Sequence, residues 1–269
     1  MILSIPNIKS FYNYRGLVVR LIRRELESRY KGSLLGILWA LLIPILMLSV
    51  YTFVFTKVFQ SHWANRPTSV TGEYSLNLFC GLLLFGIFSD AIVRAPRLIL
   101  DNASYVKKVL FPLEILPLVT VGTALLNAAI GFIVFFIFYF FVFGLPPLIS
   151  LLLPFVWAPM ILFTIGLVWF LSSIGVYFRD IQHIVGVAIS LLLFLTPIFY
   201  PISALPANAQ IIIGLNPLSI VIESSRQILF NNQLPDVFSF LISLLIGLGF
   251  FIAGSFWFAN TRRGFADVL

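Results

Sequence analysis

Carboxylates are the first side chains in this sequence that could do chemistry. Asp90, Glu114 and Asp180 lie at the ends of long apolar runs, and Glu223 lies in an apolar segment interrupted by prolines. An acid in the middle of a membrane-spanning segment is typical of proton-coupled transport. None of these four acids has that position. Their placement argues against ion coupling within this chain and for an energy source outside it.

Sequence motifs for nucleotide or metal chemistry are absent. There is no G-x-x-x-x-G-K-[ST] loop and no H-E-x-x-H motif, and the single Cys80 has no second cysteine with which to form a disulfide or metal cluster. His62 and His183 are far apart in the sequence, and His183 follows a predicted span end, where a structural role competes with catalysis. The sequence therefore predicts a chain that is not an enzyme and holds no cofactor or metal of its own.

A charged island at 94–117 separates two long apolar segments. It carries Arg94, Arg97, Lys107 and Lys108, and it is too polar to lie in lipid. We expect the island to contact a partner in the cytoplasm. We expect this contact to move the membrane-spanning rest of the chain.

Composition places the chain in a membrane. Hydrophobic residues make up 60% of the 269 residues and charged residues 10%, against about 25% charged residues in a soluble domain. The length fits one transmembrane domain, 1–269, with short loops and no room for a soluble catalytic domain. The net charge of +7 could attract nucleic acid. Cytoplasmic loops rich in Lys and Arg explain it more simply, and we expect no nucleic-acid partner.

Uncharged runs predict six transmembrane helices, because about 20 helical residues cross a hydrocarbon core of about 30 Å. Pro44 could kink the first helix. The stretch 200–232 is too interrupted by Pro and Asn for a full span, so it predicts short re-entrant or interfacial helices at 204–214 and 217–230, covered by protein or water. The six predicted spans are 34–56, 75–93, 113–142, 149–177, 182–199 and 236–259.

The first 31 residues precede the first span. Residues 1–13 are predicted to be loosely structured and residues 15–31 to form an amphipathic helix with a basic face. Glu25 and Arg29 fall on its apolar side, four residues apart, and are expected to pair with each other. Two compatible roles stay open: a helix that lies on the inner leaflet, or one that also contacts a cytoplasmic partner.

The basic residues also predict the orientation. All 17 of them except Lys57, Arg66 and Arg226 fall on one side of the membrane if both termini lie on that side. The positive-inside rule makes that side the cytoplasm. At the end of the second predicted span, Asp90 and Arg94 are one helical turn apart and are expected to neutralise each other.

Seven sequence motifs follow one another along the chain: RYKGSLLGILW at 29–39, Asn102 with KKVLFPLEILP at 107–117, YFRDI at 177–181, TPIFYP at 196–201, NPL at 216–218, Arg226, and FADV at 265–268. Together they resemble one family, the transmembrane permease subunits of type-2 ABC exporters. The resemblance is to the group that exports polysaccharides such as O-antigen, capsule and teichoic acid (the Wzm, KpsM and TagG group). It covers nearly the whole chain, and several ordered motifs are more specific than any one of them.

The resemblance implies a homodimer in the bacterial cytoplasmic (inner) membrane, with a pore at the subunit interface for a lipid-linked polysaccharide. Two separate ABC ATPase subunits would hold ATP and Mg²⁺. The loop 97–108 matches the family's coupling helix and residues 15–31 its interface helix; the ATPase-coupling residues implied are Arg24, Arg29, Arg97, Leu98, Leu100, Asn102, Tyr105, Lys107 and Lys108. The region 200–232 matches the outer gate; the gate or structural residues implied are Pro197, Pro201, Asn216, Pro217, Arg226, Arg179 and Asp180.

Aromatic residues make up 16% of the chain, including 29 Phe, and aromatic faces can guide sugar rings without binding them tightly. Tyr51, Phe55 and Phe59 form one stripe of the first predicted span by their i, i+4, i+8 spacing. The stripe fits a substrate pathway and ordinary packing equally well. The candidates for the substrate pathway are Trp39, Tyr51, Phe55, Phe59, Phe85, Phe88, Phe199 and Tyr200.

Three other functions stay open on the sequence: a type-2 ABC exporter of drugs or small lipids, an ion-coupled secondary transporter, and a membrane-embedded glycosyltransferase. The secondary transporter would need acids within the membrane. The glycosyltransferase would need a carboxylate pair beside a lipid-phosphate site, and the sequence offers no such cluster. ATPase stimulation by sugars, compared with stimulation by drugs, would separate the first alternative from polysaccharide export.

Overall fold

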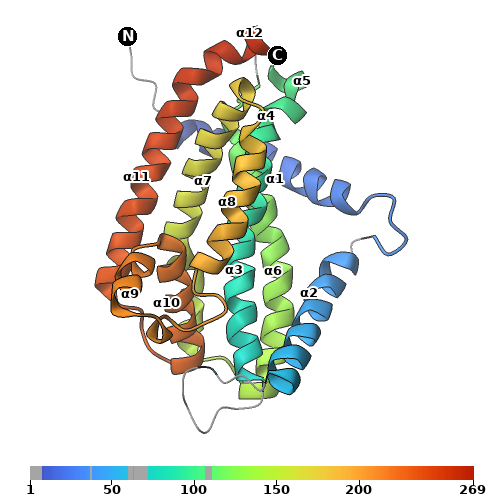
Figure 1. The fold of residues 1–269 in the computed structure, drawn as a ribbon. Coiled ribbons are helices and arrows are strands. Elements are labelled where there is room, and N and C mark those ends of the chain that lie inside the picture. Colours follow the sequence, from blue (N-terminus) through green and yellow to red (C-terminus); the bar gives the residue numbers. More distant parts are fainter. Residues whose placement is uncertain (1–7, 37, 60–62, 64–71, 107–110) are drawn as a thin grey trace.

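The computed structural model describes residues 8–36, 38–59, 63, 72–106 and 111–269. Over these ranges the chain forms helices and no strands, as predicted. Four long helices run lengthwise through the bundle: α3 (Glu73–Arg94), α6 (Ile115–Phe143), α7 (Leu153–Tyr177) and α11 (Val237–Thr261) (Figure 1). Lipid offers no hydrogen bonds to the backbone, so long apolar segments satisfy their own amide groups by folding as helices.

Five segments of the described chain are long and apolar enough to cross a membrane. They match predicted spans one to four and six: Leu38–Val58, Glu73–Asp101, Ile115–Phe143, Leu148–Tyr177 and Val237–Val268. The span predicted at 182–199 is instead the shorter α8 (Ile181–Leu195), about 22 Å long at 1.5 Å per residue. It ends early because Pro197 disfavours helical geometry at Thr196, which is extended (ψ 139°).

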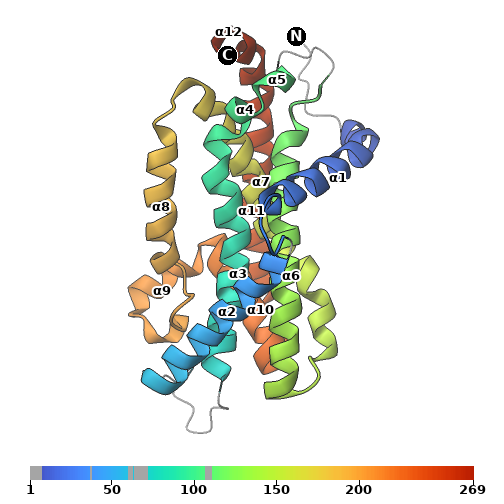
Figure 2. The same ribbon diagram turned by 90° about the vertical axis from the view of Figure 1, so that its right-hand side faces the viewer.

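Two elements lie at the periphery of the bundle. The first span consists of α2 (Leu38–Tyr51), which contains Pro44, and the π-helical η1 (Thr52–Val58). The buried residues of α2 are Ala40 and Leu48, and α2 slants across the outside of the bundle (Figure 2). The buried residue of α8 is Val185. Many of the large apolar side chains of both helices are therefore exposed in this chain.

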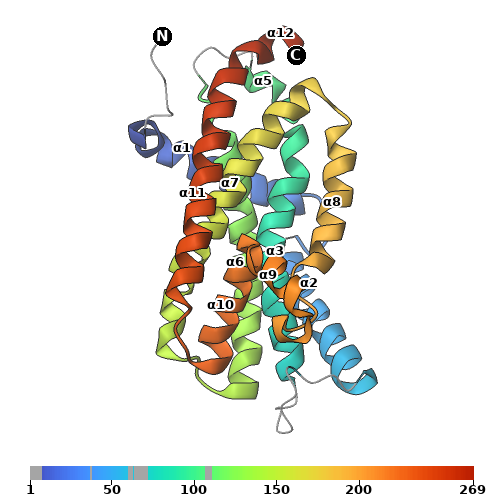
Figure 3. The same ribbon diagram turned by 60° about the vertical axis from the view of Figure 1, so that its left-hand side comes forward.

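The core lies among α3, α6 and α7, with α10 (Pro217–Asn231) and α11 packed against them. Trp169 and Phe135 are among its largest fully buried side chains. Helices α7 and α11 run side by side (Figure 3). They approach closely at Gly166, where a Cβ would collide with the backbone carbonyl of Phe250. Small residues at helix contacts are typical of membrane proteins.

The N-terminal helix α1 (Ile8–Tyr30) is longer than predicted. It includes residues 8–13, which the sequence had placed in a loosely structured lead-in, and no proline or glycine interrupts the chain there. Helix α1 crosses beside the bundle at an angle to the long helices (Figure 2). It packs on α6, where the side chain of Ile22 lies against Gly122.

The short helices predicted at 204–214 and 217–230 are confirmed as α9 (Ala207–Gly214), preceded by the single turn η4 (Ile202–Ala204), and α10. Asn216 sets the start of α10, because its side chain accepts a hydrogen bond from the Leu218 amide at 3.1 Å and a proline follows it at the first helical position. This start fixes which residues of α10 face the core.

The remaining short elements lie mostly at one end of the bundle. After α3 come η2 (Ala95–Arg97), α4 (Leu98–Asp101) and α5 (Ala103–Val106), and the chain closes with η5 (Arg262–Gly264) and α12 (Phe265–Val268). These elements share one end, and α9 lies toward the other (Figure 1). A turn, η3 (Leu148–Leu152), joins α6 to α7.

Candidate functional site

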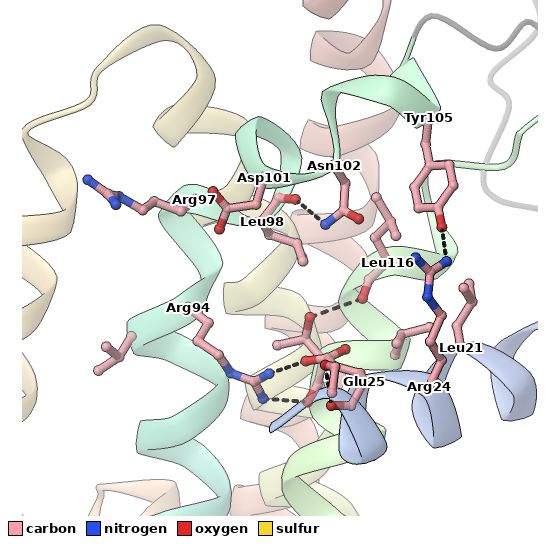
Figure 4. A pocket seen from close by; sticks show the side chains of 14 residues that line it. Leu21, Arg24, Glu25, Arg94, Arg97, Leu98, Asp101, Asn102, Tyr105 and Leu116 are labelled. Carbon is pink, nitrogen blue, oxygen red and sulfur yellow. Dashed lines mark hydrogen bonds and ion pairs between the residues drawn. The ribbon is translucent and has the colours of Figure 1, made fainter. Parts of the chain in front are cut away.

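A cleft of about 570 Å³ opens beside the predicted coupling loop (Figure 4). Helix α1 forms one wall, the end of α3 with α4 and α5 forms another, and the start of α6 closes the third side. Residues from three separate parts of the sequence thus meet at the loop. The cleft includes Arg24, Arg97, Leu98, Asn102 and Tyr105, all predicted as coupling residues.

Arg94 is the centre of an ion-pair network at this cleft. Its guanidinium pairs with Glu25 of α1, with Asp90 of α3 at 3.1 Å, and donates a hydrogen bond to the Thr120 carbonyl of α6 at 3.2 Å. Asp90 also pairs with Arg29 of α1 at 2.9 Å. The predicted Asp90–Arg94 pair is confirmed, and two ion pairs join α1 to α3.

The predicted pairing of Glu25 with Arg29 is wrong. Both side chains reach across to α3 instead, Glu25 to Arg94 and Arg29 to Asp90. They lie on the face of α1 that packs against the bundle, where charges of opposite sign already face them from α3. The pairs between the helices add to the Asp90–Arg94 pair within α3, so these four charges form one network at the contact of α1 with α3.

The loop itself is held at both of its ends. Asn102 caps α4 by donating its amide to the Leu98 carbonyl at 2.8 Å. Arg24 donates to the Tyr105 hydroxyl at 3.1 Å, so two predicted coupling residues from distant segments meet. On the other side, the Arg97 guanidinium donates to the side chain of Gln182 in α8. Leu100 is half-buried, and the predicted residues Lys107 and Lys108 lie outside the described residues.

Arg179 and Asp180 were predicted as gate or structural residues, with Arg179 among the charges on the cytoplasmic side. They precede α8 at the loop end of the bundle, which agrees with that side. Arg179 lines a hollow of about 310 Å³ together with Arg97, Leu100 and Gln182. The chain reverses between α7 and α8 at the same end as the coupling loop, which is why these residues cannot reach the short helices α9 and α10.

Arg226 forms a second polar centre, at the other end of α3. The residue is 2% exposed. It donates hydrogen bonds to the carbonyls of Asn77, Pro197 and Ile198, and its Cζ lies 4.3 Å from the ring centre of Trp63. The sequence had counted this arginine among loosely placed outer charges; its burial and its contacts with Asn77 and Trp63 were not predicted, because no local spacing connects these residues.

The other predicted gate residues, Pro201, Asn216 and Pro217, border the short helices. Pro201 precedes η4, and Asn216 with Pro217 begins α10. In the structure these residues therefore mark where the short helices begin. Within the described ranges, no three His, Cys, Asp or Glu side chains gather closely enough to hold a metal ion.

The predicted aromatic residues divide into two groups. Phe85 and Phe88 are 5% and 2% exposed, so they belong to the core of the chain and present no surface to a substrate. The others are exposed or half-buried: Trp39, Tyr51, Phe55, Phe59, Phe199 and Tyr200. Phe55 stacks on Tyr74 of α3 with ring centres 5.0 Å apart, which favours packing for that member of the stripe. Phe55 itself stands on the π-helical η1, whereas Tyr51 is the last residue of α2 and Phe59 follows η1.

Comparison with known proteins gives a consistent picture. The ABC-2 type transporter family model matches residues 16–230. The O-antigen export system permease protein RfbA of Myxococcus xanthus is 32% identical, over 97% of this chain and 98% of that protein. A protein of the same name from Klebsiella pneumoniae is 30% identical, over 94% and 95%. The polysialic acid transport protein KpsM of Escherichia coli is 24% identical, over 87% and 92%. The chain belongs to the ABC-2 type transporter family.

Proposed function

We propose that this chain is the membrane subunit of an ATP-driven exporter that moves a lipid-linked polysaccharide across the bacterial cytoplasmic membrane. The observation that carries the proposal is the similarity to O-antigen export permeases over nearly the full length of both chains. An aligned length of 97% leaves little of the chain for a different architecture. The polysaccharide-transport relative KpsM supports the same cargo class.

The energy enters, in this proposal, through separate ATPase subunits that dock on the loop 97–108 and hold ATP and Mg²⁺. Two features support a mechanical role for the loop. It continues directly from α3 through η2, and the Arg94 network ties that end of α3 to α1. A push on the loop therefore reaches α3 and α1 together. A ligand changes a conformational equilibrium only by binding the two states differently, so the ATPase must contact the loop differently with and without ATP.

The pore, in this proposal, lies between two copies of the chain. The peripheral helices α2 and α8 support this arrangement, because many of their large apolar side chains are exposed in the single chain. Trp39 on α2 is among those exposed side chains. A second copy facing α2 and α8 would enclose a passage wider than one bundle could supply.

The loop end of the bundle is assigned to the cytoplasm, with both termini there and six crossings. The basic residues around the loop support this orientation. Six crossings require α8 and the short outer helices to complete the fifth passage between them. A cysteine placed at Phe59 should then react with a membrane-impermeant maleimide from the outside of intact cells, and one placed at Arg179 should not.

The test of the proposed function is a pull-down of a tagged copy of this chain from native membranes. A stoichiometric soluble subunit with a Walker A motif is the expected result. Tyr105→Pro, which interrupts α5, should then abolish stimulation of ATP hydrolysis and export, whereas Tyr105→Phe keeps the helix and should weaken them less. A chain that purifies alone and transports in liposomes without ATP would refute the proposal. Unchanged export in Tyr105→Pro would refute the coupling role of the loop.

A further inference from the structure

The turn between α8 and η4 has three consecutive carbonyl groups that no helix satisfies. Arg226 donates to Pro197 O at 2.6 Å and to Ile198 O at 2.9 Å, and the Tyr74 hydroxyl donates to Phe199 O at 2.6 Å. A backbone carbonyl left without a donor away from water costs free energy comparable to a lost hydrogen bond. These two side chains therefore allow a non-helical turn at this depth.

Both donors also fix the turn to α3. Tyr74 is a residue of α3, and Arg226 reaches α3 by donating Nε and Nη2 to Asn77 O at 3.2 and 3.0 Å. The guanidinium fits against α3 because residue 81 is glycine, where a Cβ would lie 2.8 Å from Nη2. The turn is thus bonded to α3 through Arg226 and Tyr74 independently of the helix that precedes it.

The guanidinium group of Arg226 suits this arrangement better than the ammonium group of a lysine would. A planar fork with five N–H groups can serve carbonyls in several directions, and its charge is balanced here by Glu223 at 3.7 Å and by the Trp63 ring. A lysine would keep the charge but could not reach three carbonyls in one plane. Arg226 is therefore more than a space-filling residue of α10.

We propose that Arg226 is a positioning residue that makes the turn 197–199 move with α3. Helix α3 then acts as one rod: its loop end is bound to α1 through Arg94 and Asp90, and its other end carries the turn that leads into α9. Helix α8, whose buried residue is Val185, would follow. This inference rests on the proposed function, because it assigns a path from the ATPase-docking loop to the outer helices.

The direct test is a distance between α3 and α9. Spin labels are placed at Gly86→Cys, where a side chain meets open space, and at exposed Asn208→Cys; the fully buried Cys80 stays unmodified. Labelled chain is diluted with unlabelled chain, so that assembled pairs carry one labelled copy. The distance distribution should be the same with and without ATP, and Arg226→Gln should shift or broaden it. A distribution that shifts with ATP in the otherwise unchanged chain, or one unaffected by Arg226→Gln, overturns the proposal.

A second test separates positioning from simple stability. In the purified complex, Arg226→Gln should leave ATP hydrolysis within about twofold while export falls about tenfold or more, as expected from hydrogen bonds lost to a charged group. Gly81→Ala, which presses on Nη2, should act in the same direction, and Gly86→Ala on the same helix should have no effect. Parallel losses of complex yield, hydrolysis and export in Arg226→Gln would show a merely structural role and overturn the proposal.

Failure of the proposed function can be distinguished from failure of the inference about Arg226. If no ATPase associates with the chain, the proposed function fails. The label pair in the isolated chain still tests the inference, because the hydrogen bonds of Arg226 are internal. Arg226→Gln should broaden the Gly86–Asn208 distribution there as well, and an unaltered distribution in the isolated chain would overturn the role of Arg226.

Discussion

The ion pair between Glu25 and Arg94 is a direct measure of how firmly α1 is held to α3. Their side chains are 30% and 29% exposed, so the pair is neither on the open surface nor fully buried. Exposed pairs contribute about 0.2–1 kcal/mol, and breaking a buried pair costs about 3–5 kcal/mol. We therefore expect a coupling energy of about 1–2 kcal/mol, which changes the docking equilibrium of α1 by a factor of about 5 to 30.

The assay is a double-mutant cycle on the undocking of α1. Ile22→Cys places a thiol where α1 packs on Gly122 of α6, and the rate of maleimide labelling reports how often α1 leaves that contact. The rate is measured for the parent, Glu25→Gln, Arg94→Gln and the double variant. The cycle isolates the pair energy from the effects of each substitution alone. The single variants should label faster, and the double variant should label more slowly than their independent effects predict.

The chain offers a matched control on the same helix. Arg23 and Glu27 also form an ion pair, at 2.8 Å, but their side chains are 81% and 60% exposed. Both residues stand on α1, so their pair is present whether or not α1 is docked, and their coupling in this assay should be near zero. A Glu25–Arg94 coupling no larger than that of the control pair would refute the reasoning that this network holds α1 to α3.

Two further predictions concern stability. Gly166→Ala should lower the unfolding midpoint in detergent by an amount equivalent to about 1–3 kcal/mol, because the new Cβ meets the Phe250 carbonyl and separates α7 from α11. Gly249→Ala, whose Cβ meets open space, should leave it unchanged or raise it, and equal losses would contradict the prediction. The Ser239 amide and hydroxyl hold the pKa of Asp236 below its usual range at the start of α11. This contribution is present above the ordinary carboxyl pKa and is lost as pH falls through the lowered one. Asp236→Ala should therefore lower the midpoint at pH 7 and have a smaller effect below about pH 4; an effect independent of pH would contradict this.

Local patterns in the sequence predicted much of the fold. Long apolar runs predicted five of the spans, because the backbone of such runs must satisfy its own hydrogen bonds in lipid by forming helices. The prolines near residues 197–217 predicted the two short helices, since a proline is favoured at the first turn of a helix and disrupts its interior. The Asp90–Arg94 pair was also predictable, because one helical turn brings these side chains together. Pro197 also disfavours helical geometry at the residue before it, Thr196. The fifth span, predicted to end at 199, was therefore too long.

The tertiary structure decided the contacts that matter most for the site. Glu25 and Arg94 are 69 residues apart, and Arg226 and Asn77 are 149 apart. Helical periodicity shows which side chains share a face of one helix. It does not show which face of another helix they meet, or which charge they find there. The sequence therefore paired Glu25 with Arg29, and it placed Arg226 on the short helix 217–230 without showing what its side chain contacts. Packing instead paired Glu25 with α3 and buried Arg226 on α3, because a charge withdrawn from water is stable only where donors and acceptors of a neighbouring element surround it.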